Sequence, residues 1–328
     1  MSDAPDAIEV APAFENASRE ALIEARGLAK AYGQFRAVDG VDLTLYEGEV
    51  YGFLGPNGSG KSTTILMMLG LTEPSGGEIR VCGHDPTRDP IAVKRQVGYL
   101  PESVGFYGDL SGAENLRFTA ELNAIPNARA DARIDELLSV VELADAADQP
   151  VAQYSRGMRQ RLGLADVLLK EPRVVILDDP TLGLDPAGIQ WLLELIGELS
   201  RRRNISFFLS SHQLHEVQRI CHRVGIMSHG RLVLEGTIDE LTARLDQGGF
   251  RVTLATDGGD GLDDALRAIP GVESLARAGA QAVIASARDV RAEALSAVRE
   301  RGARLLEMRA QNTSLEEIYL RYFQEVVA

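Results

Sequence analysis

The sequence predicts an α/β fold in which a mostly parallel sheet carries helices on both faces, followed by a smaller α+β domain. Short apolar runs alternate with helical patterns up to about residue 245, an order typical of parallel sheets. One of these apolar runs is joined to the next helix by a glycine-rich loop. Because the order of elements changes after Gly249, we expect one domain of residues 21–245 and a second of residues 250–328.

The first strands are predicted from the alternation of apolar and polar side chains. Residues 23–26 alternate, and residues 38–45 alternate again with a break at Gly40. Residues 50–54 form a short apolar strand, and a helical pattern starts at Thr63. The glycine-rich loop therefore lies between a strand and a helix.

That loop, Gly55–Ser62, has the spacing G-x-x-x-x-G-K-[ST]. Glycines let the backbone pass close to a triphosphate, so that N–H groups at a helix N-terminus point at its oxygens. Lys61 would reach the β- and γ-phosphates, and the hydroxyl of Ser62 would ligate Mg²⁺. The alternative is a glycine-rich turn without a ligand. The lysine argues against it, because the chain has only four lysines among its many basic residues. We expect a nucleoside triphosphate to bind here.

The middle of the chain is predicted to be largely helical. Residues 74–81 indicate a turn and a strand, and residues 97–100 a second strand followed by Pro101 and Glu102. From there to about residue 160 the pattern is helical. Ser111 and Glu114 have the spacing of a capping box, and Ser155 is the expected N-cap of a later helix.

Two further apolar strands end in polar side chains. Residues 174–177 run into Asp178 and Asp179, and residues 205–209 run into Ser210, Ser211 and His212, with a helix at 189–199 between them. In parallel sheets, ligands bind beyond the carboxyl ends of the strands. We therefore expect the groups that follow strand ends to share one edge of the sheet: Gly55, Glu102, Asp178 and His212.

The second domain is predicted to be ferredoxin-like. Its expected order is strand, helix, two strands, helix and strand, at residues 251–255, 262–269, 272–276, 282–286, 290–301 and 304–308. A last helix is expected from Thr313, with an apolar stripe that packs on its own domain or on a second copy.

Composition excludes several classes. A net charge of −14 argues against a nucleic-acid groove, and two cysteines favour a reducing compartment over a disulfide framework. Residues 1–20 are acidic and rich in alanine and proline, so we expect a disordered tail. Because no apolar run approaches the length of a membrane span, any membrane crossing is expected to come from another chain.

With these pieces placed, residues 23–241 resemble the nucleotide-binding subunit of ATP-binding cassette (ABC) transporters. The resemblance implies a P-loop NTPase cassette, whose mostly parallel sheet has an antiparallel edge and whose helical subdomain spans about residues 103–165. It assigns ATP to Tyr32, Gly55, Pro56, Asn57, Gly58, Ser59, Gly60, Lys61, Ser62, Thr63, Ser155, Gly157 and Asp185. It assigns Mg²⁺ to Ser62, Asp178 and Glu102, and hydrolysis to Asp179, His212 and Glu102.

Tyr32 matches the aromatic residue that stacks on adenine, although on spacing alone a lone Tyr is more often a packing residue. Ser155–Met158 is similar to the serine-glycine motif that contacts ATP bound by a second copy. The segment Leu110–Glu114 looks alike but lies too far upstream, so we interpret it as a helix cap. The resemblance therefore implies a head-to-tail dimer that encloses ATP.

The sequence departs from the family pattern in three ways. Glu102 stands where Gln is usual, and Arg156 and Met158 replace a Gly and a Gln, which are changes also found in exporters. The third departure is less common, because Asp179 stands where the catalytic Glu is expected. Its side chain is one methylene shorter, so slow hydrolysis is expected.

The resemblance is to exporters whose permease is a separate polypeptide, and within them to cassettes of drug efflux, gliding and copper-enzyme maturation. It implies a peripheral protein on the cytoplasmic face of the cell membrane that binds an integral-membrane permease and no nucleic acid. Two alternatives stay open: a non-transport ABC ATPase, and a nucleotide-gated module with slow turnover because of Asp179.

Overall fold

The computed structural model describes residues 19–213, 218–245 and 250–311. The chain divides into two compact units, Met1–Gly236 and Thr237–Ala328. Helix α8 (Ile238–Leu245) therefore belongs to the second unit, whereas the sequence analysis placed it in the first. Of the tail predicted to be disordered, residues 1–18 lie outside the described residues. Glu20 is ordered, because its carboxylate accepts hydrogen bonds of 3.1 and 2.6 Å from Arg173.

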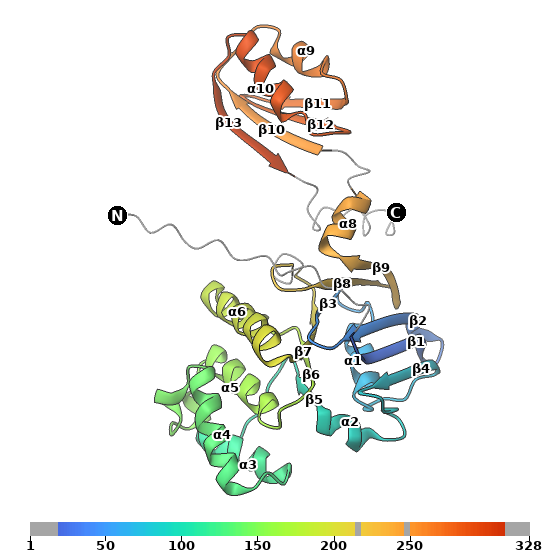
Figure 1. Cartoon of the computed structure of the whole chain (residues 1–328), viewed down its shortest axis with the longest axis vertical. Helices are drawn as coiled ribbons and strands as arrows, with labels where there is room; N and C mark the ends of the chain where they lie inside the picture. Colours follow the sequence, from blue (N-terminus) through green and yellow to red (C-terminus); the bar gives the residue numbers. More distant parts are fainter. Residues whose placement is uncertain (1–18, 214–217, 246–249, 312–328) are drawn as a thin grey trace. The chain divides into compact units, whose positions relative to one another are not determined.

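A six-stranded sheet with the order β5-β6-β7-β3-β8-β9 forms the centre of the first unit (Figure 1). The pairs β5–β6, β6–β7, β7–β3 and β3–β8 are parallel, as predicted from the alternation of strands and helices. Its strands are β3 (Val50–Leu54), β5 (Val97–Leu100), β6 (Val174–Asp178), β7 (Ser206–Ser211), β8 (Arg223–Ser228) and β9 (Arg231–Thr237).

The antiparallel strands form a sheet of their own, with the order β2-β1-β4. They are β1 (Ala21–Tyr32), β2 (Phe35–Tyr46) and β4 (Gly76–Val81). Helix α1 (Lys61–Met68) contacts β2 and β4 of this sheet and β6 of the other. Its side chains Ile65, Met67 and Met68 are buried in a core shared by both sheets, so the helix that follows the phosphate loop is fixed on two sides.

The other helices of the first unit are α2 (Pro90–Gln96), α3 (Gly112–Leu122), α4 (Asn127–Val140), α5 (Arg156–Leu168) and α6 (Pro186–Arg203). Figure 1 shows α6 and α1 on opposite sides of the central strands. Helix α3 starts with the predicted capping box, since Ser111 and Glu114 exchange hydrogen bonds between side chain and backbone. Helix α2 was not predicted, because its seven residues are too few to show a period.

The second unit has the predicted element order: β10 (Phe250–Thr256), α9 (Leu262–Arg267), β11 (Val272–Ala278), β12 (Gln281–Ser286), α10 (Arg291–Glu300) and β13 (Leu305–Gln311). Its four strands pair antiparallel in the order β11-β12-β10-β13. Side chains of α9 and α10 share a core with β10 and β12. The helix predicted from Thr313 lies outside the described residues.

No helix in the described residues is both long and apolar enough to cross a membrane.

Candidate nucleotide-binding and hydrolysis site

The phosphate loop joins the buried end of β3 to the N-terminus of α1. Gly60 is the N-cap of α1 in a left-handed conformation with φ 108°, and no acidic side chain occupies the first turn of this helix. Within the described residues, the backbone N–H groups of Gly58, Gly60 and Ser62 have no hydrogen-bond partner. Free N–H groups at a helix N-terminus attract anions. These three N–H groups can therefore donate to phosphate oxygens without first breaking other hydrogen bonds.

Two glycines of the loop, Gly55 and Gly60, are required by close contacts, and Gly60 is also required by its left-handed conformation. A Cβ on Gly60 would lie 2.4 Å from the carbonyl oxygen of Ala37, and one on Gly55 would lie 2.6 Å from that of Met227. Both contacts are far shorter than van der Waals distance. The buried hydroxyl of Ser59 has no hydrogen-bond partner in the described structure. A close-fitting loop with an unpaired hydroxyl is what a phosphate group requires.

Lys61 is folded back over the loop and is 5% exposed. Its ammonium group donates to the carbonyl oxygens of Gly55 at 2.8 Å and Pro56 at 3.3 Å. Burial lowers the pKa of Lys61, while the carboxylates of Asp179 and Asp178 oppose that shift. The structure therefore brings the predicted lysine and both predicted carboxylates into one electrostatic environment.

Asp178 ends β6 and is held by the neighbouring strand β7. Its Oδ1 accepts a short hydrogen bond from the hydroxyl of Ser210, and the side chain is nearly buried. The same hydroxyl and the carbonyl oxygen of Ser210 accept bonds of 3.2 and 3.1 Å from the backbone N–H of Asp179. Ser210 thus positions both acidic residues. The sequence analysis gave it no role, although its place just before His212 was the available signal.

Asp179 and His212 form a pair at the ends of β6 and β7. Oδ1 of Asp179 accepts from the backbone N–H of His212 at 3.2 Å and lies 2.8 Å from the ring atom Nδ1. Because an ionised carboxylate only accepts hydrogen bonds, Nδ1 is the ring atom that donates to it. Asp179 has φ 45°, a left-handed conformation that Asp tolerates better than most residues.

Ser155 and Asp185 cap two helices whose N-termini open onto one cavity. Oγ of Ser155 accepts from the N–H of Met158 at 3.2 Å, and Oδ1 of Asp185 accepts from the N–H of Gly188 at 2.7 Å. These residues and Gly157 line a cavity of about 630 Å³. The structure therefore brings together the serine-glycine motif and the loop around Asp185, which are thirty residues apart in the sequence.

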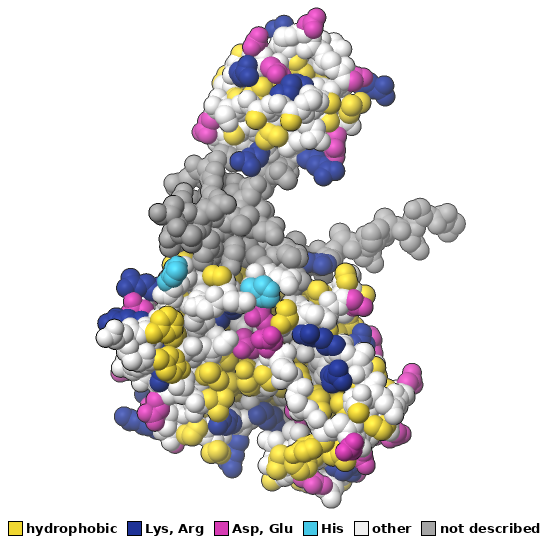
Figure 2. Space-filling model, turned by 180° about the vertical axis from the view of Figure 1, so that it is seen from behind, with side chains coloured by type: hydrophobic (Ala, Val, Ile, Leu, Met, Phe, Trp, Pro, Cys, Tyr) yellow, Lys and Arg dark blue, Asp and Glu magenta, His cyan; other side chains and the backbone are white. Residues whose placement is uncertain are grey.

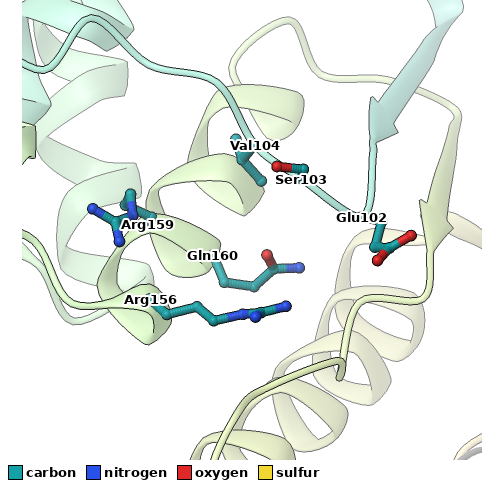
Figure 3. Close-up of a pocket in the computed structure, with 6 residues that line it drawn as sticks. All are labelled: Glu102, Ser103, Val104, Arg156, Arg159 and Gln160. Atoms are coloured by element: carbon teal, nitrogen blue, oxygen red, sulfur yellow. The ribbon is translucent and has the colours of Figure 1, made fainter.

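Glu102 lies on the loop after β5 and is exposed. It lines a cavity of about 340 Å³ with Arg156 and Gln160, both of which extend from α5 toward it (Figure 3). Within the described residues, no hydrogen bond joins Glu102 to Asp178 or Ser62. The structure thus places Glu102 beside the first turns of α5, and its predicted contact with Mg²⁺ remains a prediction.

Tyr32 ends β1 with half of its surface exposed. The ammonium group of Lys30 lies 5.1 Å from the centre of its ring, over the aromatic face. An exposed ring on a strand end can stack on a base. The geometry is compatible with the predicted adenine contact.

The possible ligands for Mg²⁺ are the side chains of Asp178 and Ser62. The described residues contain no group of three or more His, Cys, Asp or Glu side chains able to hold a metal by themselves. Mg²⁺ is, however, usually bound by one or two carboxylates together with substrate phosphates and water. Asp178 supplies a carboxylate and Ser62 an exposed hydroxyl. These donors fit a Mg²⁺ that arrives with a nucleotide.

Comparison with known proteins identifies the family. The ABC transporter family matches residues 38–182. The bacitracin transport ATP-binding protein BcrA of Bacillus licheniformis is 41% identical over 223 residues, which are 68% of this chain and 72% of that protein. This chain belongs to the ABC transporter family. It is an ATP-binding subunit of the exporter-like kind, and the predicted ABC ATPase is confirmed.

A second ABC relative extends across both units. The daunorubicin resistance ATP-binding protein DrrA3 of Streptomyces coeruleorubidus is 35% identical over 305 residues, covering 92% of this chain and 95% of that protein. An alignment of this length must continue into the second unit, which begins at Thr237. The second unit is therefore part of what the two ABC proteins share.

Solved structures agree with the ABC assignment. An ATP-binding subunit of an ABC transporter superposes with a TM-score of 0.63 at 32% identity, covering 68% of this chain and 93% of that one. A dimeric ATP-binding cassette bound to ADP and phosphate superposes with a TM-score of 0.60 at 23% identity, which shows a shared fold. The predicted cassette fold is confirmed.

Proposed function

We propose that this ABC subunit hydrolyses ATP with Mg²⁺ and drives export through a separate membrane permease. The observation that carries the proposal is the grouping of Lys61, Asp178 and the Asp179–His212 pair at one edge of the central sheet. The loop binds phosphate oxygens through backbone N–H groups, and Lys61 turns from its loop carbonyls toward the β- and γ-phosphates. Asp178 and Ser62 hold Mg²⁺, which neutralises phosphate charge when it is bound.

Asp179 is proposed to orient the attacking water. A group in this role must lie within hydrogen-bond reach of the nucleophile. One carboxylate oxygen of Asp179 is occupied by His212, so the other oxygen is available for water. His212 then fixes the direction of the short side chain. Slow turnover is expected, because Asp reaches less far than the Glu common in this family.

The active form is proposed to be a head-to-tail dimer that encloses ATP. Ser155 and Asp185 line a cavity on the first unit, and the N-terminus of α5 has no acidic residue in its first turn. A partner's γ-phosphate would complete this half-site. Each copy would thus supply the phosphate loop to one nucleotide and the Ser155 region to the other.

The permease is proposed to contact the helical region around α3. The rings of Tyr107 and Phe118 pack edge to face with their centroids 5.1 Å apart. Tyr107 is 58% exposed, Phe118 is 38% exposed and Leu122 is 71% exposed. Figure 2 shows hydrophobic side chains gathered at the end of the first unit that α3 forms. Exposed apolar clusters of this kind mark protein interfaces. Through such a partner the chain would work at the cytoplasmic face of the cell membrane.

The cargo is proposed to be a compound of the kind named for the relatives, one of which is a bacitracin transport protein and another a daunorubicin resistance protein. A pull-down from detergent-solubilised membranes tests the proposed contact with a permease. The wild-type chain should retain a multi-span membrane protein, Leu122→Asp should lose it, and Leu306→Asp, a matched exposed leucine of the second unit, should retain it. Retention of no membrane protein by the wild type would contradict the transport role.

A further inference from the structure

A third cavity of the first unit lies away from the residues assigned to ATP. It has a volume of about 270 Å³ and is formed where α2, the α3–α4 turn, α4 and the end of α5 meet. All of its charged lining residues are basic, in a chain whose net charge is −14. The lining consists of Arg95, Asn123, Ile125, Arg129, Arg133, Leu169 and Lys170.

Arg133 is the most buried of these cations, with a side chain that is 13% exposed. One guanidinium nitrogen donates to Glu136 at 2.6 Å and another to the carbonyl oxygen of Leu168 at 3.3 Å. Its third nitrogen, Nε, is buried and has no acceptor in the described structure. A buried donor without a partner is costly, so its presence calls for an acceptor.

Arg95 and Lys170 also retain capacity for an anion. Arg95 is exposed in the last turn of α2, and within the described residues it forms neither a hydrogen bond nor an ion pair. The ammonium group of Lys170 donates to the carbonyl oxygen of Lys94, which leaves two of its three protons. Burial lowers the pKa of Lys170, and the carboxylate of Asp166 opposes the shift.

A simpler explanation is that these cations only complement the carbonyl ends of helices. It accounts for the bonds from Lys170 to Lys94 and from Arg133 to Leu168. The pairing of Arg129 with Glu171 has an equally local explanation. Within the described residues, the helix-end explanation does not account for the unpaired Nε of Arg133 or for the unpaired guanidinium group of Arg95. Arg133 and Arg95 are both lining residues of the same cavity.

We propose that this cavity binds a small free phosphate-bearing anion, such as inorganic phosphate. Arginine and lysine side chains recognise phosphate through charge-assisted hydrogen bonds. The volume lies just below the range of about 300–1,000 Å³ usual for drug-sized ligands, which favours a small anion over a nucleotide. The anion would tie Arg95 of the α/β part to Arg133 of the helical region.

The site is separate from the half-site around Ser155 that is proposed to contact a partner's ATP. Helix α5 runs from Arg156 to Leu168, and its 13 residues span about 20 Å. Ser155 lies at one end of this helix, and Leu169 and Lys170 of the cavity lie at the other. The proposal therefore stands whether or not the role of Ser155 is correct.

The test is a calorimetric titration of orthophosphate at constant ionic strength. Lys61→Ala is the background for every variant, because it removes the ammonium group proposed to bind phosphate at the loop. The Lys61→Ala variant should bind phosphate saturably, and adding Arg95→Glu should raise the Kd for phosphate at least tenfold. Arg299→Glu is the matched control, since it is also an exposed arginine in the last turn of a helix. It should leave the Kd unchanged.

A third variant tests the buried donor. Arg133→Lys keeps the charge but removes Nε, so it should also weaken phosphate binding, with thermal unfolding recorded to show that the chain still folds. Three outcomes would overturn the proposal. One is a lack of phosphate binding on the Lys61→Ala background, and another is equal weakening by Arg95→Glu and Arg299→Glu. The last is Arg95-dependent binding to phosphatidic acid vesicles with none to free phosphate.

Discussion

Nδ1 of His212 lies 2.8 Å from Oδ1 of Asp179, and the backbone N–H of His212 donates to the same oxygen at 3.2 Å. Two donors from one residue thus hold one carboxylate oxygen. The acid proposed to position water is therefore oriented by the strand next to its own. Ser210 of β7 also fixes the backbone of Asp179, because its hydroxyl and its carbonyl oxygen both accept hydrogen bonds from the Asp179 N–H.

If this pair acts as a unit, removing either member should cost about as much as removing both. His212→Ala should lower the rate of the chemical step about 100-fold, because Asp179 is then free to turn. Asp179→Asn should lower it similarly, and the double variant should be little worse than either single one. Single-turnover hydrolysis measures the three rates. Strictly additive losses would mean that the two side chains act independently.

The length of the acid can be tested directly. Asp179→Glu should raise turnover several-fold and leave ATP affinity nearly unchanged, because the longer arm reaches the water. The left-handed backbone, with φ 45°, suits Asp better than Glu, so a loss of stability of about 1 kcal/mol is expected. If turnover falls instead, the backbone is already adapted to Asp. If the Asp179→Asn variant hydrolyses ATP as fast as the wild type, Asp179 is not the catalytic acid.

Assembly should depend on nucleotide. In the Asp179→Asn variant, Mg-ATP should shift the chain from monomer to dimer in light scattering, because each nucleotide bridges two half-sites. Ser155→Arg should prevent the shift by filling the site of the partner's γ-phosphate. Ser139→Arg, at an exposed helix position of the same region, should not. A size independent of ATP in a chain truncated at Gln247 would contradict the nucleotide-bridged dimer.

Two buried groups at the start of β3 and β8 should give opposite pH effects on stability. Burial raises the pKa of Glu49 from 4.5 to about 7, so the folded state binds the extra proton between these values and this contribution is lost as pH rises. Burial lowers the pKa of His222 from 6.5 to about 4, so its contribution is present above pH 6.5 and is lost as pH falls.

Urea unfolding at pH 5 and pH 7.5 separates the two. Between pH 5 and pH 7.5, the free energy of unfolding of Glu49→Gln should rise by about 2 kcal/mol relative to that of the wild type. That of His222→Asn should fall by a similar amount relative to the wild type. Asn is chosen because its carbonyl oxygen can replace Nδ1 as the acceptor of the Val50 N–H. Parallel pH profiles for the wild type and Glu49→Gln would show that Glu49 is ionised in the folded protein.

Local patterns made much of the fold predictable. The capping box at Ser111, the N-cap at Ser155 and the element order of the second unit were all confirmed, because each depends on residues close in sequence. Helix α2 was missed, since its start is marked only by Pro90 and its seven residues are too few for a hydrophobic period. The boundary at Gly236 differs from the composition-based one, because no Gly- or Pro-rich linker marks it.

The site was predictable as a set of residues but not as a set of contacts. Spacing identified Lys61 and Asp178, whereas the double role of Ser210 depends on the pairing of β6 with β7. Lys61 bonds to its own loop because buried ammonium groups require acceptors, and no sequence pattern records that. The position of Glu102 beside Arg156 likewise comes from the packing of α5 on β5.

The central claim is that the loop ending in Lys61 hydrolyses ATP, and phosphate release by the purified chain with Mg-ATP tests it most directly. Lys61→Ala should abolish release, because it removes the charge that faces the β- and γ-phosphates. Lys94→Ala removes a lysine outside the site whose side chain forms no hydrogen bond within the described residues, and it should leave the rate unchanged. Hydrolysis by Lys61→Ala at the wild-type rate would contradict the entire site assignment.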